Sequence, residues 1–242
     1  MQIKTILFHG GKGGVGTTTL AAETAGSLSR RRRRVAAVDL DIFGGDLHYR
    51  LDLPLSRGTH TLADLLPVLD EVDGRILDNA LSTCGCGARL LPSPASSAAA
   101  GFVEERHIKK VLHALAREFD YVIVDTPCSL DRVTAAALDA SGLVVLVITP
   151  ELACLGGAKK ALVEMETLGM VDHQTALVVN RSLDDADLFT VRDIESFLSL
   201  PVNFVLPEDT IMCRRAGDEG RLLTSEHSRL SQAVEELVDR II

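Results

Sequence analysis

The sequence contains no tryptophan, and aromatic residues make up 4% of its 242 residues, whereas 46% are apolar. This aliphatic-rich composition is typical of soluble α/β proteins, and the length allows a sizeable core in one large domain or two small ones. Positive charge is also scarce, because 25 lysines and arginines stand against 34 acidic residues, for a net charge of −9. That balance argues against direct nucleic-acid binding, which depends on clustered positive charge.

Long apolar segments are absent as well. No apolar run approaches the roughly 20 residues that cross a bilayer, so we expect no intrinsic membrane anchor. The N-terminus, MQIKTILFHGG, lacks the longer apolar core and cleavage site of a signal peptide and predicts a β-strand instead. The five cysteines are scattered, and the one close pair, Cys84 and Cys86, has no second pair to complete a zinc site. We interpret them as ordinary loop thiols of a cytoplasmic protein.

Apolar runs of strand length alternate with helix-like segments along the chain. Candidate strands cover residues 3–9, 35–40, 88–92, 121–125, 143–148, 175–180 and 202–206. Candidate helices cover residues 17–30, 104–117, 153–168, 190–199 and 226–241. Strands that are apolar at consecutive positions are buried on both faces, and their alternation with helices implies a parallel sheet with right-handed crossovers. We predict one α/β domain over residues 1–242, with seven or eight mostly parallel strands, and place residues 93–101 in a surface loop.

The segment between the first strand and the first helix is rich in glycine, which occupies five of the seven positions from Gly10 to Gly16. Glycine lets several backbone N–H groups face one concave surface, and a helix beginning near Thr17 adds its positive dipole end. Residues 11–18 fit the phosphate-loop pattern G-x-x-x-x-G-K-[ST], except that Thr17 replaces the lysine. Thr18 holds the position whose hydroxyl coordinates Mg²⁺. The segment predicts a P-loop NTPase fold, and a glycine-rich turn that binds nothing is the weaker alternative.

Acidic and polar residues follow several predicted strands, where parallel sheets bind their ligands. Asp39 and Asp41 are two apart at the end of one strand and so lie on one side of it, and Asp125 ends another. Carboxylates beside a phosphate loop suit Mg²⁺ binding and the positioning of water. The alternative is that one of the first two caps the following turn. Asn180 ends another predicted strand and Pro207 follows the last, and both are ordinary terminating residues as well as candidate ligands.

The segments KGGVGTTT (12–19) and VDLD (38–41) resemble the deviant phosphate loop and second strand of the ParA/MinD family of P-loop ATPases. The resemblance implies that ATP or ADP is bound by Gly11, Lys12, Gly13, Gly14, Val15, Gly16, Thr17, Thr18 and Thr19. It implies that Mg²⁺ is held by Thr18, Asp39, Asp41 and Asp125. Contacts to the base are implied for Asn180, Arg181, Pro207, Glu208 and Asp209. The resemblance also implies a homodimer with sandwiched nucleotide, in which Lys12 reaches the partner's nucleotide and Asp41 orients the attacking water.

Two residues depart from the family pattern. The usual phosphate-binding lysine belongs at Thr17, and Ser129 stands where relatives have a glycine that senses the γ-phosphate. Losing a cation beside a triphosphate weakens binding and, more strongly, the stabilisation of charge that develops during hydrolysis. We therefore expect a weak ATPase that acts as a binding switch first and as an enzyme second.

A narrower resemblance, to the CpaE/TadZ branch that helps place and assemble Tad-type (type IVb) pili, covers nearly the whole chain. It rests on residues 10–21, 38–53, 60–66, 89–94, 143–152, 178–181 and 206–209. Atypical phosphate loops are common in that branch. The resemblance implies pilus or polar-localisation partners and recruitment to the inner face of the membrane or to a cell pole. A positioning ATPase for the division site, the flagellum or partitioning, or a scaffold without hydrolysis, remains an open alternative.

Two charged segments have simpler interpretations. The arginine run 30–34 ends the helix after the phosphate loop, where cations complement the helix dipole, although an acidic lipid or partner is the alternative. The C-terminal helix, 226–241, carries apolar residues at helical spacing together with Glu235, Glu236 and Asp239. Because these acidic residues would repel anionic lipid, we expect this helix to pack on the core.

Overall fold

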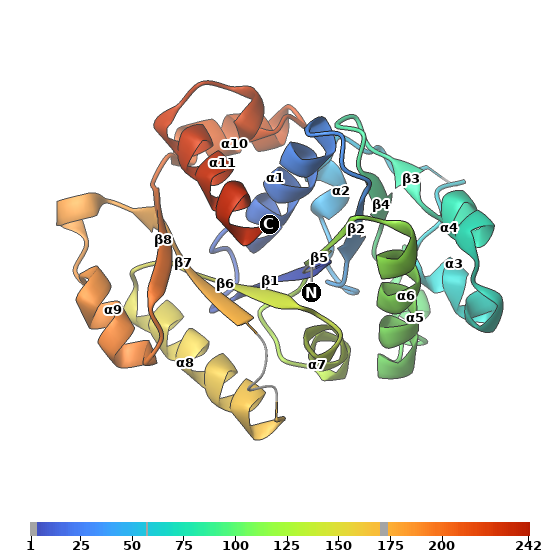
Figure 1. Ribbon diagram of the computed structural model, residues 1–242, viewed down its shortest axis with the longest axis horizontal. Helices are drawn as coiled ribbons and strands as arrows, with labels where there is room; N and C mark the ends of the chain where they lie inside the picture. Colours follow the sequence, from blue (N-terminus) through green and yellow to red (C-terminus); the bar gives the residue numbers. More distant parts are fainter. Residues whose placement is uncertain (1–3, 57, 170–173) are drawn as a thin grey trace.

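The computed structural model describes residues 4–56, 58–169 and 174–242, which build an eight-stranded sheet with the order β3-β4-β2-β5-β1-β6-β7-β8 (Figure 1). The strands are β1 (Thr5–Gly10), β2 (Val35–Asp39), β3 (Ser82–Thr83), β4 (Arg89–Leu91), β5 (Tyr121–Asp125), β6 (Leu143–Ile148), β7 (Gln174–Ser182) and β8 (Val202–Pro207). Neighbouring strands are parallel except for β3 and β4.

Helices cover both faces of this sheet. They are α1 (Thr17–Arg30), α2 (Leu47–Arg50), α3 (Leu62–Leu65), α4 (Gly74–Ala80), α5 (Ser97–Ala100), α6 (Glu105–Glu118), α7 (Arg132–Asp139), α8 (Leu152–Thr167), α9 (Val191–Leu198), α10 (Thr210–Asp218) and α11 (Arg229–Ile241). Short 3₁₀ helices cover Leu66–Glu71, Asp184–Ala186 and Leu223–Ser225. In Figure 1, α1 and α11 lie on one face, and α6, α7 and α8 lie on the other. None of the described helices is long and apolar enough to span a membrane.

The central strands and the long helices follow directly from the apolar pattern. Every residue of β1, β2, β5 and β6 is buried, which explains why their sequences are apolar at consecutive positions. α6 buries Ile108, Val111, Leu112 and Leu115, the three- and four-residue spacing of one helix face. α11 buries one such face in the core, as the sequence predicts. Helices on both faces of a mostly parallel sheet confirm the predicted fold class.

The structure differs from the sequence predictions in several places. All seven predicted strands form, although residue 3 of the first lies outside the described residues, and the two-residue β3, which pairs with β4 alone within the described chain, is the eighth strand of the predicted seven or eight. α7 and α10 were not predicted, although aspartates at positions 131 and 209 cap their N-termini. The segment 93–101 is not simply a surface loop, because Ser93 and Pro94 are buried and residues 97–100 form α5. Likewise, Cys154 is a buried residue of α8 rather than a loop thiol.

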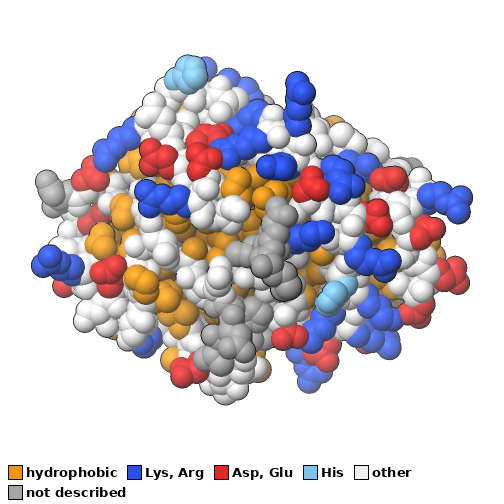
Figure 2. Space-filling view, in the orientation of Figure 1, with side chains coloured by type: hydrophobic (Ala, Val, Ile, Leu, Met, Phe, Trp, Pro, Cys, Tyr) orange, Lys and Arg blue, Asp and Glu red, His pale blue; other side chains and the backbone are white. Residues whose placement is uncertain are grey.

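The arginine run contacts acidic side chains on neighbouring elements. Arg30 and Arg31 pair with Glu235 of α11 at 2.9 and 2.5 Å, and Arg34 pairs with Asp120 at 3.1 Å. The contacts of Arg30 and Arg31 tie the end of α1 to the C-terminal helix, so part of the run's charge is neutralised within the chain. On the face shown in Figure 2, basic and acidic side chains are interspersed. This face therefore offers no extended basic surface of the kind that binds nucleic acid without sequence preference.

A buried carboxylate completes the contact between α1 and the C-terminal region. Glu23 accepts hydrogen bonds from the backbone N–H groups of Leu223 and Thr224, at 2.6 and 3.0 Å, and from the Thr224 hydroxyl. We expect Glu23→Ala to lower the free energy of unfolding by about 2 to 4 kcal/mol, because it strands these donors. Chemical denaturation measures the change. Glu236→Ala, which removes the same charge from an exposed position of α11, should cost under about 0.5 kcal/mol, and equal losses in both variants would contradict this role.

Candidate functional site

The glycine-rich loop lies between the end of β1 and the start of α1, at the carboxyl edge of the central strands. Gly16, the N-cap of α1, has φ +102°, and a Cβ there would lie 2.4 Å from Nδ2 of Asn180. Only glycine combines that backbone conformation with so close an approach. Among the described residues, no side chain caps α1 and none in its first turn is acidic. The N–H groups of that turn therefore face outward as an anion-binding end.

Asn180 holds this loop in place from the end of β7. Its amide Nδ2 donates a 2.7 Å hydrogen bond to the carbonyl oxygen of Val15, and the Val15 side chain is buried in the core. The side chain of Thr17 lies over Gly10, because a Cβ on that glycine would be 2.6 Å from the Thr17 hydroxyl oxygen. The loop is thus fixed on both sides before any ligand binds, which reduces the ordering cost of binding.

Two buried carboxylates lie beside the loop on neighbouring strands. Asp39 of β2 and Asp125 of β5 are directly paired in the sheet, and their exposed fractions are 0% and 2%. Asp39 accepts hydrogen bonds from the backbone N–H groups of Asp41 and Leu47, at 3.1 and 3.2 Å, so both of its oxygens are used. Within the described part of the chain, Oδ1 of Asp125 is buried without a hydrogen-bond partner. An orphaned carboxylate oxygen fits a cation at this point.

The environment of these carboxylates favours their neutral forms. The pKa of Asp39 is raised to about 7, chiefly by burial and also by the charges of Asp41 and Asp46, while the two backbone N–H groups oppose the rise. Burial also raises the pKa of Asp125 well above its usual range, the charge of Asp39 adds to this, and a hydrogen bond with the Thr18 side chain opposes it. A divalent cation beside the pair would stabilise both carboxylates in their ionised forms.

The raised pKa of Asp39 predicts a pH dependence of stability. Folded Asp39 keeps its proton up to about pH 7, whereas the unfolded residue loses it near pH 4. Without cation or nucleotide, the contribution of Asp39 to the free energy of unfolding should therefore fall by a few kcal/mol from about pH 4 to 7 and change little above that range. Denaturant titrations at several pH values measure this slope. Because Asp125 and His9 also have shifted pKa values, the difference in slope between the unaltered chain and Asp39→Asn isolates the contribution of Asp39, and equal slopes would contradict the prediction.

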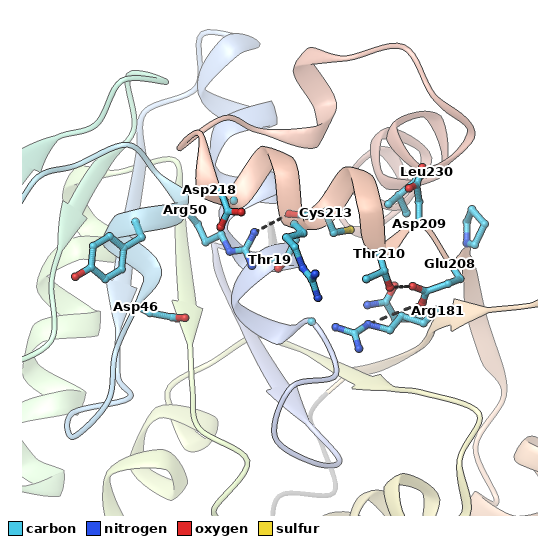
Figure 3. A pocket seen from close by; sticks show the side chains of 16 residues that line it. Thr19, Asp46, Arg50, Arg181, Glu208, Asp209, Thr210, Cys213, Asp218 and Leu230 are labelled. Atoms are coloured by element: carbon cyan, nitrogen blue, oxygen red, sulfur yellow. Dashed lines mark hydrogen bonds and ion pairs between the residues drawn. The ribbon is translucent and has the colours of Figure 1, made fainter.

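Two cavities meet at the loop. The first, here called the loop cavity, measures about 360 Å³ and is lined by the loop together with Asp41, Arg50, Asp125 and Arg181. The second, the outer cavity, measures about 620 Å³ and lies between α2, α10 and the ends of β7 and β8 (Figure 3). Both are lined by Gly16, Thr19, Asp46, Arg50 and Arg181, so they form one continuous depression. The loop cavity suits phosphates, and the larger outer cavity suits a base and sugar.

The structure brings most of the sequence-predicted residues into this depression. The loop cavity is lined by Lys12, Gly13, Gly14, Gly16, Thr17, Thr18, Thr19, Asp41, Asp125 and Arg181. The outer cavity is lined by Asn180, Arg181, Pro207, Glu208 and Asp209. Gly11, Val15 and Asp39 line neither cavity. Asp39 instead shapes the turn after β2, so its role as a metal ligand stays a prediction.

Three predicted residues also have structural contacts of their own. Asp41 accepts a hydrogen bond from the Gly44 N–H at 3.1 Å and so caps the following turn, the alternative that the sequence left open. Asp209 caps α10 through the Met212 N–H at 3.0 Å. Lys12 forms a 3.5 Å ion pair with Glu151, and both side chains are more than half exposed. An ion pair so exposed to solvent is weak, so it holds Lys12 only loosely.

Sequence reasoning did not identify Asp46, Arg50 or Cys213 as part of the depression. Arg50 ends α2, a four-residue helix, and no motif spacing distinguished it from a surface arginine. Cys213 belongs to α10, a helix that was not predicted. Only the folded arrangement of β2, β8 and the segments that follow them brings these residues together.

The glycine-rich strand-to-helix turn, the open end of α1 and the carboxylate at the end of β5 define the class of P-loop nucleotide-binding folds. A family model described as AAA domain matches residues 3–178. The septum site-determining protein MinD of Thermotoga maritima is 30% identical over 98% of this chain and 87% of its own length. A ParA family ATPase from Chlorobium tepidum superposes with a TM-score of 0.90 at 26% identity, over 98% of this chain and 97% of that one. The chain belongs to the ParA/MinD family of P-loop ATPases.

Structures with lower sequence identity show the same fold. MinD from Pyrococcus horikoshii, solved in complex with Mg-ADP, superposes with a TM-score of 0.84 at 23% identity, over 99% of this chain and 96% of that one. The shared fold covers the whole described chain rather than the loop alone.

Proposed function

We propose that the chain is a Mg-ATP-dependent dimeric switch that positions a larger cellular assembly and hydrolyses ATP slowly. The observation that carries the proposal is the loop cavity, where the open N-terminus of α1 lies beside the unpartnered oxygen of Asp125. Among the relatives, MinD is named for septum-site determination, and a variant of McdA from Cyanothece has been solved in complex with ATP. These relatives support the nucleotide and the positioning role.

The residues of this chain have distinct tasks in that function. The N–H groups at the start of α1 would bind phosphate oxygens, and Thr18 and Asp125 would hold the Mg²⁺ ion. Asp41 orients water at the cavity, and Asn180 keeps the loop in its binding conformation. When bound, Mg-ATP would supply the phosphoanhydride bond that is cleaved in the hydrolysis reaction. Because Thr17 cannot provide the usual cation, the chain binds the nucleotide better than it stabilises the charge that develops during hydrolysis.

Lys12 gives the dimer its nucleotide dependence in this proposal. Its weak ion pair with Glu151 lets the ammonium group leave the rim and contact the phosphates of a second copy. Light scattering should therefore show dimers with a non-hydrolysable ATP analogue and monomers with ADP. Lys12→Ala should stay monomeric in both, whereas Lys160→Ala, which removes an exposed lysine of α8, should dimerise normally. Dimerisation that does not depend on Lys12 or on ATP would contradict this switch.

The assembly we propose is the Tad-type pilus. This finer assignment is supported by the similarity of the sequence segments to the CpaE/TadZ branch and by the atypical loop with Thr17. In the native host, deletion of the chain should abolish surface pili, and the unaltered chain but not Lys12→Ala should restore them. Pili that form normally without the chain would remove this assignment and leave the positioning switch in place.

The second candidate is a positioning ATPase for the division site or for partitioning, favoured by the similarity to MinD over nearly the whole chain. Such an ATPase works on a membrane or DNA surface that stimulates its turnover. The acidic residues of α11 and the net charge of −9 weigh against both surfaces. Turnover measured with and without anionic vesicles or DNA separates the candidates, because strong stimulation by either one favours this second candidate.

A further inference from the structure

The loop cavity contains two arginines that no motif assigns to phosphate binding. Among its described lining residues the cations are Lys12, Arg50 and Arg181. Lys12 is paired with Glu151 at the rim, whereas both arginines line the loop cavity and the outer cavity together. We propose that Arg50 and Arg181 supply, from within the same subunit, the positive charge that Thr17 fails to bring to the nucleotide's phosphates. The inference deepens the proposed function and rests on it.

The backbone at the end of β7 directs Arg181 into the cavity. The pairing of β7 with β8 shifts register between Val179 and Ser182, and Arg181 has φ +57°. Such irregularities redirect side chains next to functional sites, and a left-handed conformation is costly for a residue with a side chain. As a result, Asn180 holds the loop while Arg181, the next residue, lines both cavities. Arg181 also forms an ion pair with Glu208. The pair is weak, because the distance is 4.0 Å and the Arg181 side chain is half exposed.

Arg50 reaches the depression from the opposite side, on α2 (Figure 3). Its Nη1 donates a 3.2 Å hydrogen bond to the carbonyl oxygen of Cys213 in α10. The guanidinium packs so closely on α10 that a Cβ at Gly217 would lie 2.2 Å from Nη1. A glycine inside a helix costs up to about 1 kcal/mol relative to alanine, and here it makes room for this arginine. Among the described residues the Cys213 carbonyl oxygen is the one hydrogen-bond acceptor that the guanidinium contacts, so we expect its remaining N–H groups to be available to a ligand.

The chemistry of the two side chains suits this task. A guanidinium is always charged and presents several N–H donors in a plane, which match phosphate oxygens in pairs. The two arginines line both cavities, whereas Thr17 lines the loop cavity alone, so we expect the arginines to act on the bound triphosphate more than on the transferring γ-phosphoryl group. The arrangement explains how a chain with Thr17 retains ATP binding while hydrolysis stays slow.

The test measures Mg-ATP and AMP affinities of the full-length chain and its variants by calorimetry. Arg50→Gln with Arg181→Gln should weaken ATP binding about 100-fold and AMP binding less than about threefold, since AMP carries one phosphate. Arg50→Lys, which keeps the charge, should retain most of the ATP affinity.

In the Thr17→Lys background, the Arg50→Gln and Arg181→Gln double substitution should weaken ATP binding tenfold or less, because the added lysine supplies the positive charge. Arg215→Gln, on α10 but lining neither cavity, should bind ATP within about twofold of the unaltered chain.

Thermal unfolding of each variant confirms that it is folded at the temperature of the binding measurement. Unchanged ATP affinity in the double variant would overturn the inference while leaving the proposed function intact. An equal loss for AMP and ATP would also overturn it, because the arginines would then only hold the pocket in shape. Failure of the unaltered chain to bind ATP would overturn the proposed function and, with it, this inference.

Discussion

Replacing Asp125 by asparagine is expected to weaken Mg²⁺-dependent ATP binding by 100-fold or more, and to stabilise the nucleotide-free protein at pH 8. Oδ1 of Asp125 is buried and unpartnered within the described chain, beside the equally buried Asp39. In the absence of a cation, two such neighbouring charges repel each other and are poorly solvated. Asparagine removes one of them, so the nucleotide-free fold gains roughly 1 kcal/mol or more. The same change removes the anionic oxygen that a bound Mg²⁺ requires, which costs roughly 3 kcal/mol of binding.

The substitution is expected to weaken Mg-ATP binding and at the same time to stabilise the nucleotide-free protein. General damage to the fold would lower both quantities, so this combination is specific to a metal-site residue. Binding is measured by titrating fluorescent ATP with and without Mg²⁺, and stability by denaturant unfolding at pH 8. Asp70→Asn is the matched control, because Asp70 is an exposed aspartate that pairs with Lys110 far from the loop cavity. It should change neither quantity appreciably. An Asp125→Asn variant that binds Mg-ATP normally, or that is less stable than the unaltered chain at pH 8, would show that Asp125 is not a metal-site residue.

Replacing Thr17 by lysine is expected to raise ATP turnover about 10- to 100-fold and to tighten ATP binding by up to about tenfold. Thr17 is the first residue of α1 and lines the loop cavity, so a longer cationic side chain there reaches the phosphates. Single preorganised groups that stabilise developing charge are worth 10²–10³ in rate in other enzymes, and we expect part of that gain here. Affinity should change less than rate, because Arg50 and Arg181 already provide charge for the bound state.

Steady-state phosphate release and equilibrium binding measure the two effects. Thr17→Met is the matched control, since it adds length without charge and should increase neither turnover nor affinity. Equal behaviour of the lysine and methionine variants would mean that position 17 acts through shape alone. No change in turnover or binding for Thr17→Lys would mean that residue 17 does not face the phosphates.

Much of the fold could be predicted from the sequence, because the central strands are buried on both faces. β5 and β6 are apolar at nearly every position, and that continuity identifies them without knowledge of tertiary contacts. The start of α1 was equally clear from the glycines that precede it. By contrast, β3 has two residues and depends on β4 for its pairing, so its own sequence carries almost no signal. α10 exposes most of its residues and lacks a strong apolar stripe.

The residues of the candidate site also fall into two groups, those whose position the sequence predicts and those whose position depends on tertiary contacts. Residues 11–19 follow β1, and Asp125 and Asn180 lie at the carboxyl ends of β5 and β7, so their position at the carboxyl edge was predictable from topology alone. The position of Arg50 was not predictable in this way. It lies on a short helix, and its guanidinium is fixed by a contact with Cys213 of α10, 163 residues later in the sequence. The hydrogen bond from Asn180 to Val15 likewise depends on how β7 meets the loop, which spacing does not reveal.

The central claim is that this chain binds ATP with Mg²⁺ although Thr17 replaces the phosphate-loop lysine. Equilibrium titration of the purified chain with labelled ATP tests it most directly, in the presence of Mg²⁺ and again with a chelator. We predict saturable binding at one site per chain, displaced by unlabelled ATP and weakened about 100-fold or more when Mg²⁺ is removed. Absence of saturable binding with Mg²⁺ present would contradict the claim.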